Sequence, residues 1–273
     1  MRLLFVGDIV GRPGRAILVE RLPGLIADHA VDFTVVNGEN AAHGFGITPS
    51  TFEEIVGAGA DAVTFGNPTF DQKQALTLAD ADDRFVRPAN YPPGTPGRGS
   101  FLFETKAGAR VLVANLMGQL FMAPLLDDPF AHADRILDGM ELGGAADAIL
   151  IDFHAETTSE TQCFGHHCDG RASVVVGTHT HVPTSDARVL PGGTAYQTDA
   201  GMTGAYDSSI GMDKEEPLAR FQRKMSGGRM EVATGPPTLC GLVVDVSDRT
   251  GLAERCAPLR LGGDLAETEP DWW

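Results

Sequence analysis

The strongest constraint on the fold of this chain is an alternation of short, continuously apolar runs with helical segments in its first half. The runs are RLLFVG (2–7), FTVVN (33–37) and DAVTFG (61–66). Apolar runs without polar interruptions are typical of strands that are covered on both faces. A strand–helix–strand order implies parallel pairing through right-handed crossovers, which predicts an α/β fold.

A helix is predicted between the second and third of these strands. Its start signal is Thr48-Pro49-Ser50, and Glu53 follows Ser50 by three residues, as in a capping box. Gly57 or Gly59 predicts its end.

The second half of the chain is richer in strands. The expected strands are 100–105, 110–116, 148–154, 172–181, a hairpin over 187–198, 229–234 and 239–247, with helices around 130–141 and before residue 172. The sequence contains no repeat, and the Pro/Gly-rich segment 90–99 is short enough to be an ordered loop. We therefore expect one domain over residues 1–273, a two-sheet sandwich flanked by helices.

Composition excludes several classes of partner. The formal net charge is −16, which opposes binding of long nucleic acids, although a small phosphorylated ligand is compatible if bound cations reverse the local field. No stretch reaches the roughly 20 apolar residues that span a bilayer, and the first residues read as a strand rather than a signal peptide. These features predict a cytoplasmic protein without a membrane partner. The four cysteines are too few for a disulfide framework of this size.

Polar side chains follow the predicted buried strands at the point where each strand ends. They are Asp8, Glu39, Asn40, Asn67, His154, His179 and His181. Ligands gather at the carboxyl ends of strands in parallel sheets, so we expect these seven side chains to lie close together. His179 and His181 are two residues apart, and on an extended segment such side chains point the same way.

Each of these residues also has a simpler interpretation. Asp8 could cap the following helix, Asn40 or Asn67 could stabilise a turn, and a single strand-end His is more often structural. Taken together, three imidazoles, two carboxylates and two amides form a donor set suited to Mn, Fe or Zn. Two ions would need a bridging carboxylate between them.

The ordered motifs GDIVG, NGEN, GN, DFHAE and GTHTHVPT resemble those of the calcineurin-like metallophosphoesterases, and more closely the bacterial YmdB family, described as 2′,3′-cyclic-nucleotide 2′-phosphodiesterases. RPANYPPGTPG and AYQTDAGMTG also match that family, so the resemblance covers nearly the whole chain. It implies a metal-dependent hydrolase of small phosphoesters with two divalent ions, Fe or Mn first and Zn or Mg as alternatives. One ion would be held by Asp8, Glu39, Asn40 and His181, and the other by Glu39, Asn67, His154 and His179. A homo-oligomer is compatible with the resemblance.

One position departs from the family pattern. The family has Gly-Asn-His where this chain has Gly66-Asn67-Pro68, and that His is the expected proton donor to the leaving oxygen. Proline can donate no proton, which predicts reduced turnover with metal and substrate binding retained. His43 is the one nearby replacement that the sequence offers, although a plain loop residue is the simpler interpretation. The alternative functions are a catalytically silent protein that binds metal and nucleotide for regulation, and a metal-free structural protein.

Three further features have weaker interpretations. The segment CFGHHC (163–168) is spaced too tightly for a common structural zinc site and is predicted to be a polar helix end. Arg87 and Asn90 are expected to brace their loop rather than bind substrate. The two terminal tryptophans are expected to pack on a neighbour or to fray.

Overall fold

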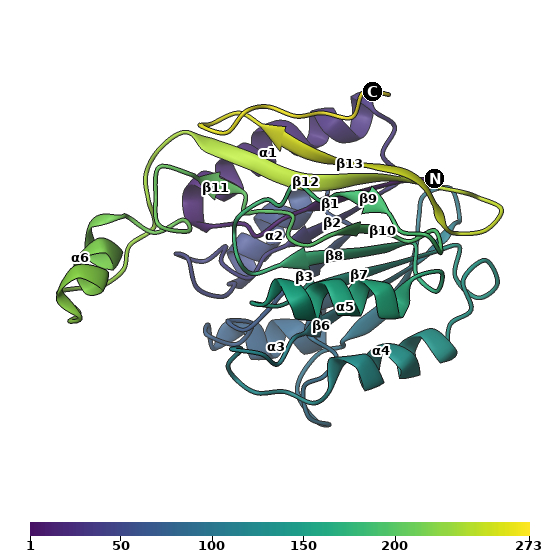
Figure 1. Ribbon diagram of the computed structural model, residues 1–273, viewed down its shortest axis with the longest axis horizontal. Helices are drawn as coiled ribbons and strands as arrows, with labels where there is room; N and C mark the ends of the chain where they lie inside the picture. Colours follow the sequence, from purple (N-terminus) through teal and green to yellow (C-terminus); the bar gives the residue numbers. More distant parts are fainter.

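Two β-sheets pack face to face, and helices cover the outer face of each sheet (Figure 1). This arrangement is seen in a computed structural model that describes residues 1–273. It confirms the predicted α/β/β/α sandwich.

The first sheet has seven strands: six follow the order β11-β12-β1-β2-β3-β4, and β13 pairs with β12 outside this path. Its strands are β1 (Arg2–Val6), β2 (Phe33–Asn37), β3 (Ala62–Thr64), β4 (Phe85–Val86), β11 (Gly204–Ala205), β12 (Pro237–Val246) and β13 (Ala253–Leu261). The four strands β1 to β4 are parallel, as the strand–helix alternation predicts. β1 also pairs antiparallel with β12, where Arg2 lies opposite Asp245.

The second sheet has six strands in the order β5-β6-β7-β8-β10-β9. Its strands are β5 (Ser100–Glu104), β6 (Arg110–Met117), β7 (Ala148–His154), β8 (Val174–Thr178), β9 (Arg188–Val189) and β10 (Ala195–Gln197). The β5–β6 and β9–β10 pairs are antiparallel, which confirms both predicted hairpins. β6, β7 and β8 are parallel, so the two sheets share one feature, a parallel centre.

Six helices complete the fold. They are α1 (Gly11–Asp28), α2 (Pro49–Gly57), α3 (Gln74–Ala81), α4 (Pro129–Asp138), α5 (Thr158–Cys168) and α6 (Glu215–Arg223). The first three cover the first sheet, and α4 and α5 cover the second (Figure 1). None of the helices has both the length and the apolar character needed to cross a membrane.

The core follows from the two-residue period of the strands. In β1, Leu4 and Val6 pack under the helices, whereas Leu3 and Phe5 face the second sheet. Between the sheets lie 18 buried apolar residues, contributed by both. Full burial of each Leu or Phe contributes roughly 1.5–3 kcal/mol, so the joint between the sheets is a major source of stability.

Three local expectations were wrong. Thr48, not Ser50, caps α2, and the capping box closes with Thr51 rather than Glu53. Residues 229–234 form only an isolated bridge between Met212 and Val232, because no strand lies beside them. The last strand of the first sheet is instead β13, which the sequence pattern did not reveal.

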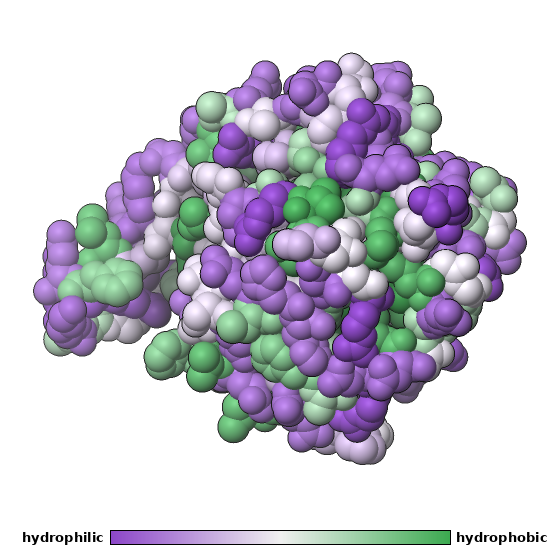
Figure 2. Space-filling view, turned by 45° about the vertical axis from the view of Figure 1, so that its right-hand side comes forward, coloured by the Kyte–Doolittle hydropathy of each residue, from purple (hydrophilic) through white to green (hydrophobic).

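Two surface features complete the description. The terminal tryptophans pack on their own chain. Trp273 stacks on His29 with ring centroids 3.9 Å apart, and Arg255 lies over the Trp272 ring. Helix α6 projects from the body of the molecule (Figure 1). Leu218, Phe221 and Met225 are exposed there, and Figure 2 shows apolar side chains gathered on this projection.

Candidate metal centre

The seven strand-end side chains converge where parallel strands of both sheets end. Asp8 follows β1, Glu39 and Asn40 follow β2, and Asn67 follows β3, all in the first sheet. His154 is the last residue of β7, and His179 and His181 follow β8, in the second sheet. The site therefore lies at one end of the joint between the sheets.

Glu39, His154 and His179 form the first metal-compatible group, with one ligand atom of each within 4.8 Å of the others. Glu39 Oε2 lies 2.9 Å from His154 Nε2, and Asn67 Oδ1 lies 3.1 Å from the same nitrogen. The rings of His154 and His179 meet edge to face with centroids 4.7 Å apart. An amide oxygen, a carboxylate and two imidazoles thus surround one point.

Asp8, Glu39 and His181 form the second group, again with ligand atoms within 4.8 Å of one another. His181 Nε2 lies 3.0 Å from Asn40 Oδ1 and 3.7 Å from Glu39 Oε1. Asn40 Nδ2 donates to Gly44 O, which turns the amide oxygen towards the site. Glu39 is the one residue that belongs to both groups.

The hydrogen bonding of two carboxylate oxygens in this cluster indicates whether the cluster is suited to cations. Asp8 Oδ1 and Glu39 Oε2 are buried and have no hydrogen-bond partner. Glu39 Oε2 is close to His154 Nε2, but it lies off the direction in which a ring N–H would donate. A buried carboxylate oxygen without a donor is costly unless it is paired with a charge or coordinates a metal. The donor set therefore fits divalent cations better than it fits a hydrogen-bonded structural cluster.

The alternative role of Asp8 as a helix cap is wrong. The residue that precedes α1 is Val10, and no side chain caps this helix. Asp8 Oδ2 instead accepts a hydrogen bond of 3.3 Å from the backbone N–H of His179, in the other sheet.

The loop that carries two of the histidines is not the extended segment that the sequence suggested. β8 ends at Thr178, and His179 and His181 have φ values of 105° and 64°. Positive φ is costly for residues other than glycine and persists where the surroundings impose it. Asp199 supplies this restraint, because its carboxylate accepts from the N–H and the hydroxyl of Thr180 and from Gly201 N–H.

Electrostatics couple the buried groups tightly. Burial raises the pKa of Asp8 well above its ordinary value, and the Glu39 carboxylate raises it further. Burial would also raise the pKa of Glu39, but His154 and His181 outweigh it and lower that pKa to about 2. For His181, burial would lower the pKa, but the two carboxylates outweigh it and raise it to about 9. Burial and His154 together lower the pKa of His179 to about 3. Groups that compete for protons this closely release them when a divalent cation binds.

Each histidine has a partner for the ring nitrogen that points away from the cluster. His181 Nδ1 donates to Ile210 O at 2.8 Å, and His179 Nε2 lies 3.1 Å from Glu156 Oε2. His154 Nδ1 lies 2.9 Å from the Thr178 hydroxyl. Metal-binding histidines are usually fixed in this way, through the nitrogen that does not bind the metal.

Three supporting carboxylates were missed by the sequence reasoning: Asp152, Glu156 and Asp199. Asp152 and Glu156 lie two residues before and after His154, within the motif DFHAE, so the motif itself carried a signal. Asp199 is 18 residues beyond His181, and nothing in local spacing connects it to the site.

Comparison with known proteins shows the family of this chain. A sequence model of the family described as "YmdB-like protein" matches residues 4–259. The chain belongs to the YmdB-like family.

Relatives of this YmdB-like protein include named hydrolases. It is 47% identical over 264 residues to the "2',3'-cyclic-nucleotide 2'-phosphodiesterase" of Bacillus subtilis (strain 168), covering 97% of this chain and 98% of the relative. A solved structure from Mycoplasma pneumoniae, titled as a novel phosphatase, shares 32% identity with a TM-score of 0.89, covering 100% of this chain and 95% of that one. A structure of a hypothetical protein from Thermus thermophilus shares 40% identity and also has a TM-score of 0.89, covering 97% of this chain and 100% of that one.

Pro68, the residue after Asn67, lies in a tight turn. Pro68 is buried, and the backbone N–H and hydroxyl of Thr69 both donate to Gly66 O across the turn. His43 is exposed, and its side chain makes no hydrogen bond with the cluster. It lines a separate hollow of about 510 Å³ with Thr48, Ser50 and others.

The remaining motifs of this YmdB-like protein lie outside the strand-end cluster. Arg87 donates only to backbone carbonyls of its own loop, and Asn90 exchanges hydrogen bonds with the Met117 backbone, so both brace as expected. In α5, Cys163 is exposed while Cys168 is buried, so the CFGHHC side chains diverge.

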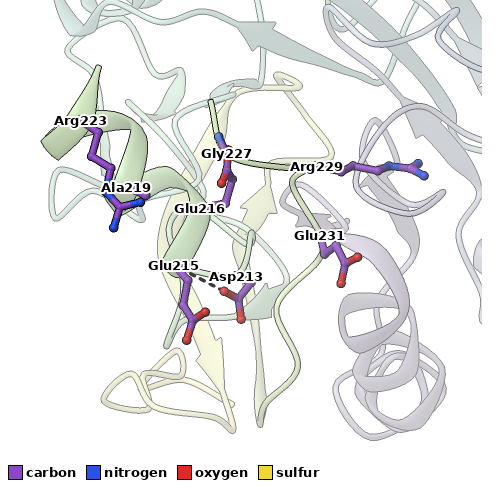
Figure 3. A pocket seen from close by; sticks show the side chains of 8 residues that line it. All are labelled: Asp213, Glu215, Glu216, Ala219, Arg223, Gly227, Arg229 and Glu231. Carbon is purple, nitrogen blue, oxygen red and sulfur yellow. Dashed lines mark hydrogen bonds between the residues drawn. The ribbon is translucent and has the colours of Figure 1, made fainter. Parts of the chain in front are cut away.

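A hollow of about 490 Å³ beside α6 also lies apart from the centre. It is lined by Asp213, Glu215, Glu216, Ala219, Arg223, Gly227, Arg229 and Glu231 (Figure 3). It contains no histidine, cysteine or buried acid, and we assign it no chemistry.

Proposed function

We propose that this protein is a metal-dependent phosphodiesterase that acts on small phosphodiesters, with 2′,3′-cyclic nucleotides as the substrate class. The observation that carries the proposal is the pair of carboxylate–imidazole groups that share Glu39, with two buried carboxylate oxygens that lack donors. The name of the 47% identical relative supports the substrate class. Ligands contributed by both sheets support a single metallophosphoesterase domain over residues 1–273. The expected cytoplasmic location and homo-oligomer stay predictions.

Seven residues would hold two divalent ions, Fe or Mn first and Zn or Mg as alternatives. One ion would be bound by Asp8, Asn40 and His181, the other by Asn67, His154 and His179, and both by Glu39. Asp8 and Glu39 contribute two negative charges, and two divalent ions would contribute four positive charges. The remaining positive charge suits a phosphate anion, even though the protein as a whole is acidic.

The bound cations would activate water and offset the charge that develops on the phosphate oxygens. The chain itself positions them. Glu39 and Asp8 supply charge in a site that water enters poorly, where electrostatic interactions are strong. Ile210 O, Glu156 and Thr178 hold the three imidazole rings so that the opposite nitrogens face the cluster.

Protonation of the leaving oxygen is the step to which residue 68 can contribute no proton. Pro68 has no side-chain group that can donate a proton and no backbone N–H, and the exposed His43 makes no hydrogen bond with the cluster. General acid catalysis is typically worth about 10²–10⁴-fold, so we expect slow turnover with solvent water in this role.

The decisive experiment combines metal analysis with hydrolysis assays. The protein is purified after growth with Mn²⁺ or Fe²⁺, its metal content is measured, and it is assayed with 2′,3′-cyclic AMP and with a bis-aryl phosphate. Two ions per chain and metal-dependent release of the 3′-nucleotide would support the proposal. A chain that takes up no metal would contradict it.

A second candidate function is a catalytically silent protein that binds metal and nucleotide as a regulator. What favours it is that residue 68 is a proline, which has no proton to donate. It predicts two bound ions and saturable nucleotide binding, but no product even with high enzyme concentration and long incubation.

Gly66 packs closely against Glu39 and His154, so a larger residue at this position tests whether these two groups bind metal. A Cβ on this residue would lie 2.2 Å from both Glu39 Oε2 and His154 Nε2. We expect Gly66→Ala to displace these groups and to weaken metal binding by at least about 10-fold, the scale on which disturbed ligand orientation acts. Bound Mn²⁺ per chain, measured by elemental analysis after dialysis, checks this.

Gly57→Ala is the matched control, because a Cβ at the end of α2 meets nothing within 4 Å. It should bind metal like the parent chain. Equal metal content in both variants would show that Glu39 and His154 do not need their close approach to Gly66.

A further inference from the structure

A buried carboxylate below the cluster is connected to one of its histidines. Asp152 in β7 is fully buried, and its two oxygens accept hydrogen bonds from three strands of the two sheets. Asn37 Nδ2 (2.9 Å) and Thr64 Oγ1 (2.5 Å) donate to Oδ2, and Thr178 Oγ1 (2.7 Å) donates to Oδ1. Asn37 Oδ1 also accepts from the backbone N–H of Glu39 at 3.0 Å, so this network reaches the bridging residue as well.

The direction of each hydrogen bond in this network is fixed by the chemistry of the groups. An ionised carboxylate can only accept, so the single hydroxyl proton of Thr178 must point to Asp152. The hydroxyl can then offer only a lone pair to His154 Nδ1, 2.9 Å away. Nδ1 must therefore carry a proton, which leaves Nε2 as the ring nitrogen that can present a lone pair to a cation.

We propose that Asp152 is a positioning residue that acts through Thr178 to keep His154 Nε2 available as a metal ligand. The inference rests on the metal centre of the proposed function and adds a residue that touches neither ion nor substrate. This role differs from a purely structural one. It depends on which group donates and which accepts in each hydrogen bond, not only on whether a bond is present.

Asp152→Asn is the sharpest test, since the amide has nearly the same shape. Its oxygen can still accept from Asn37 and Thr64, which leaves its NH₂ facing Thr178. Thr178 must then accept that bond and direct its own proton at His154 Nδ1, so the single proton of the neutral ring moves to Nε2. We expect affinity for the ion bound by His154 to fall 10- to 100-fold, the usual effect of a disturbed outer-shell partner.

A pair of threonine variants separates this role from a structural one. Thr178→Val removes the hydroxyl between Asp152 and His154, whereas Thr64→Val removes a hydroxyl that donates to the same carboxylate but is not hydrogen-bonded to His154. Both threonines are fully buried, so the two changes are comparable in packing. Thr178→Ser keeps the hydroxyl and should restore binding.

The measurement is Mn²⁺ binding to the metal-stripped chain, by competition with a fluorescent chelator, alongside thermal unfolding of the same samples. We expect one of two Mn²⁺ equivalents to weaken in Asp152→Asn and Thr178→Val, with parent-like binding in Thr64→Val and Thr178→Ser. Equal weakening in Thr64→Val and Thr178→Val, or parent-like binding in Asp152→Asn, would overturn the inference. If the parent chain binds no Mn²⁺, the proposed metal centre itself fails, which is a different result.

Discussion

Glu39→Gln is expected to leave at most one metal ion per chain and to lower phosphodiesterase activity by more than about 100-fold. Glu39 belongs to both ligand groups and is 2% exposed, so no other carboxylate can replace it. Gln keeps the shape but removes one negative charge and one anionic oxygen. Changes in outer-shell partners already cost 10- to 100-fold, so loss of a shared ligand should cost more. Elemental analysis and hydrolysis of 2′,3′-cyclic AMP by the same sample measure both effects.

Thermal unfolding adds an independent readout for this variant. Ions that bind only the folded chain raise its unfolding temperature, so Mn²⁺ should stabilise the parent chain and have a smaller effect on Glu39→Gln. Glu53→Gln makes the same chemical change on the exposed face of α2 and should behave as the parent does. A Glu39→Gln chain that still carries two ions would show that Glu39 is not the bridge.

Pro68→His is expected to raise kcat by about 10²- to 10⁴-fold while leaving the metal content unchanged. The turn at this position is held by Thr69, which donates from its backbone N–H and hydroxyl to Gly66 O, and neither bond involves the side chain at 68. A histidine there can therefore be accepted without loss of the turn. Because the donor must be protonated, the pH profile of kcat should also gain a fall on its alkaline side.

Pro68→Ala is the control for removal of the ring itself. It frees the backbone but adds no proton donor, so its kcat should stay near that of the parent. If Pro68→His is no faster than Pro68→Ala with two ions bound, the leaving oxygen needs no acid from this position.

The strands of the core could be predicted because their signal is local. β2 and β7 match the predicted residues 33–37 and 148–154 at both ends. Both are uniformly buried, so an apolar run alone is enough to define them. The convergence of seven side chains followed from one rule about strand ends, and the structure brings all seven together.

The errors arose where a distant partner decides the outcome. Residues 229–234 alternate as a strand would but pair only through the isolated Met212–Val232 bridge. β13 contains Pro258 and charged residues, and it is a strand because β12 lies beside it. His179 and His181 both reach the site, but through positive φ values that Asp199 maintains rather than through strand alternation. The hydrogen-bond network around Asp152 could not be predicted from local sequence either, because Thr64 and Asn37 lie 88 and 115 positions away.

The place of β1 between β2 and β12 has a consequence for how the protein is made. Arg2 lies opposite Asp245, so one neighbour of the first strand leaves the ribosome more than 200 residues after it. Contacts of such long sequence separation form late and slow folding. Asp8, which directly follows β1, thus gains its full support only when synthesis is nearly finished, and binding of the proposed cations would follow translation.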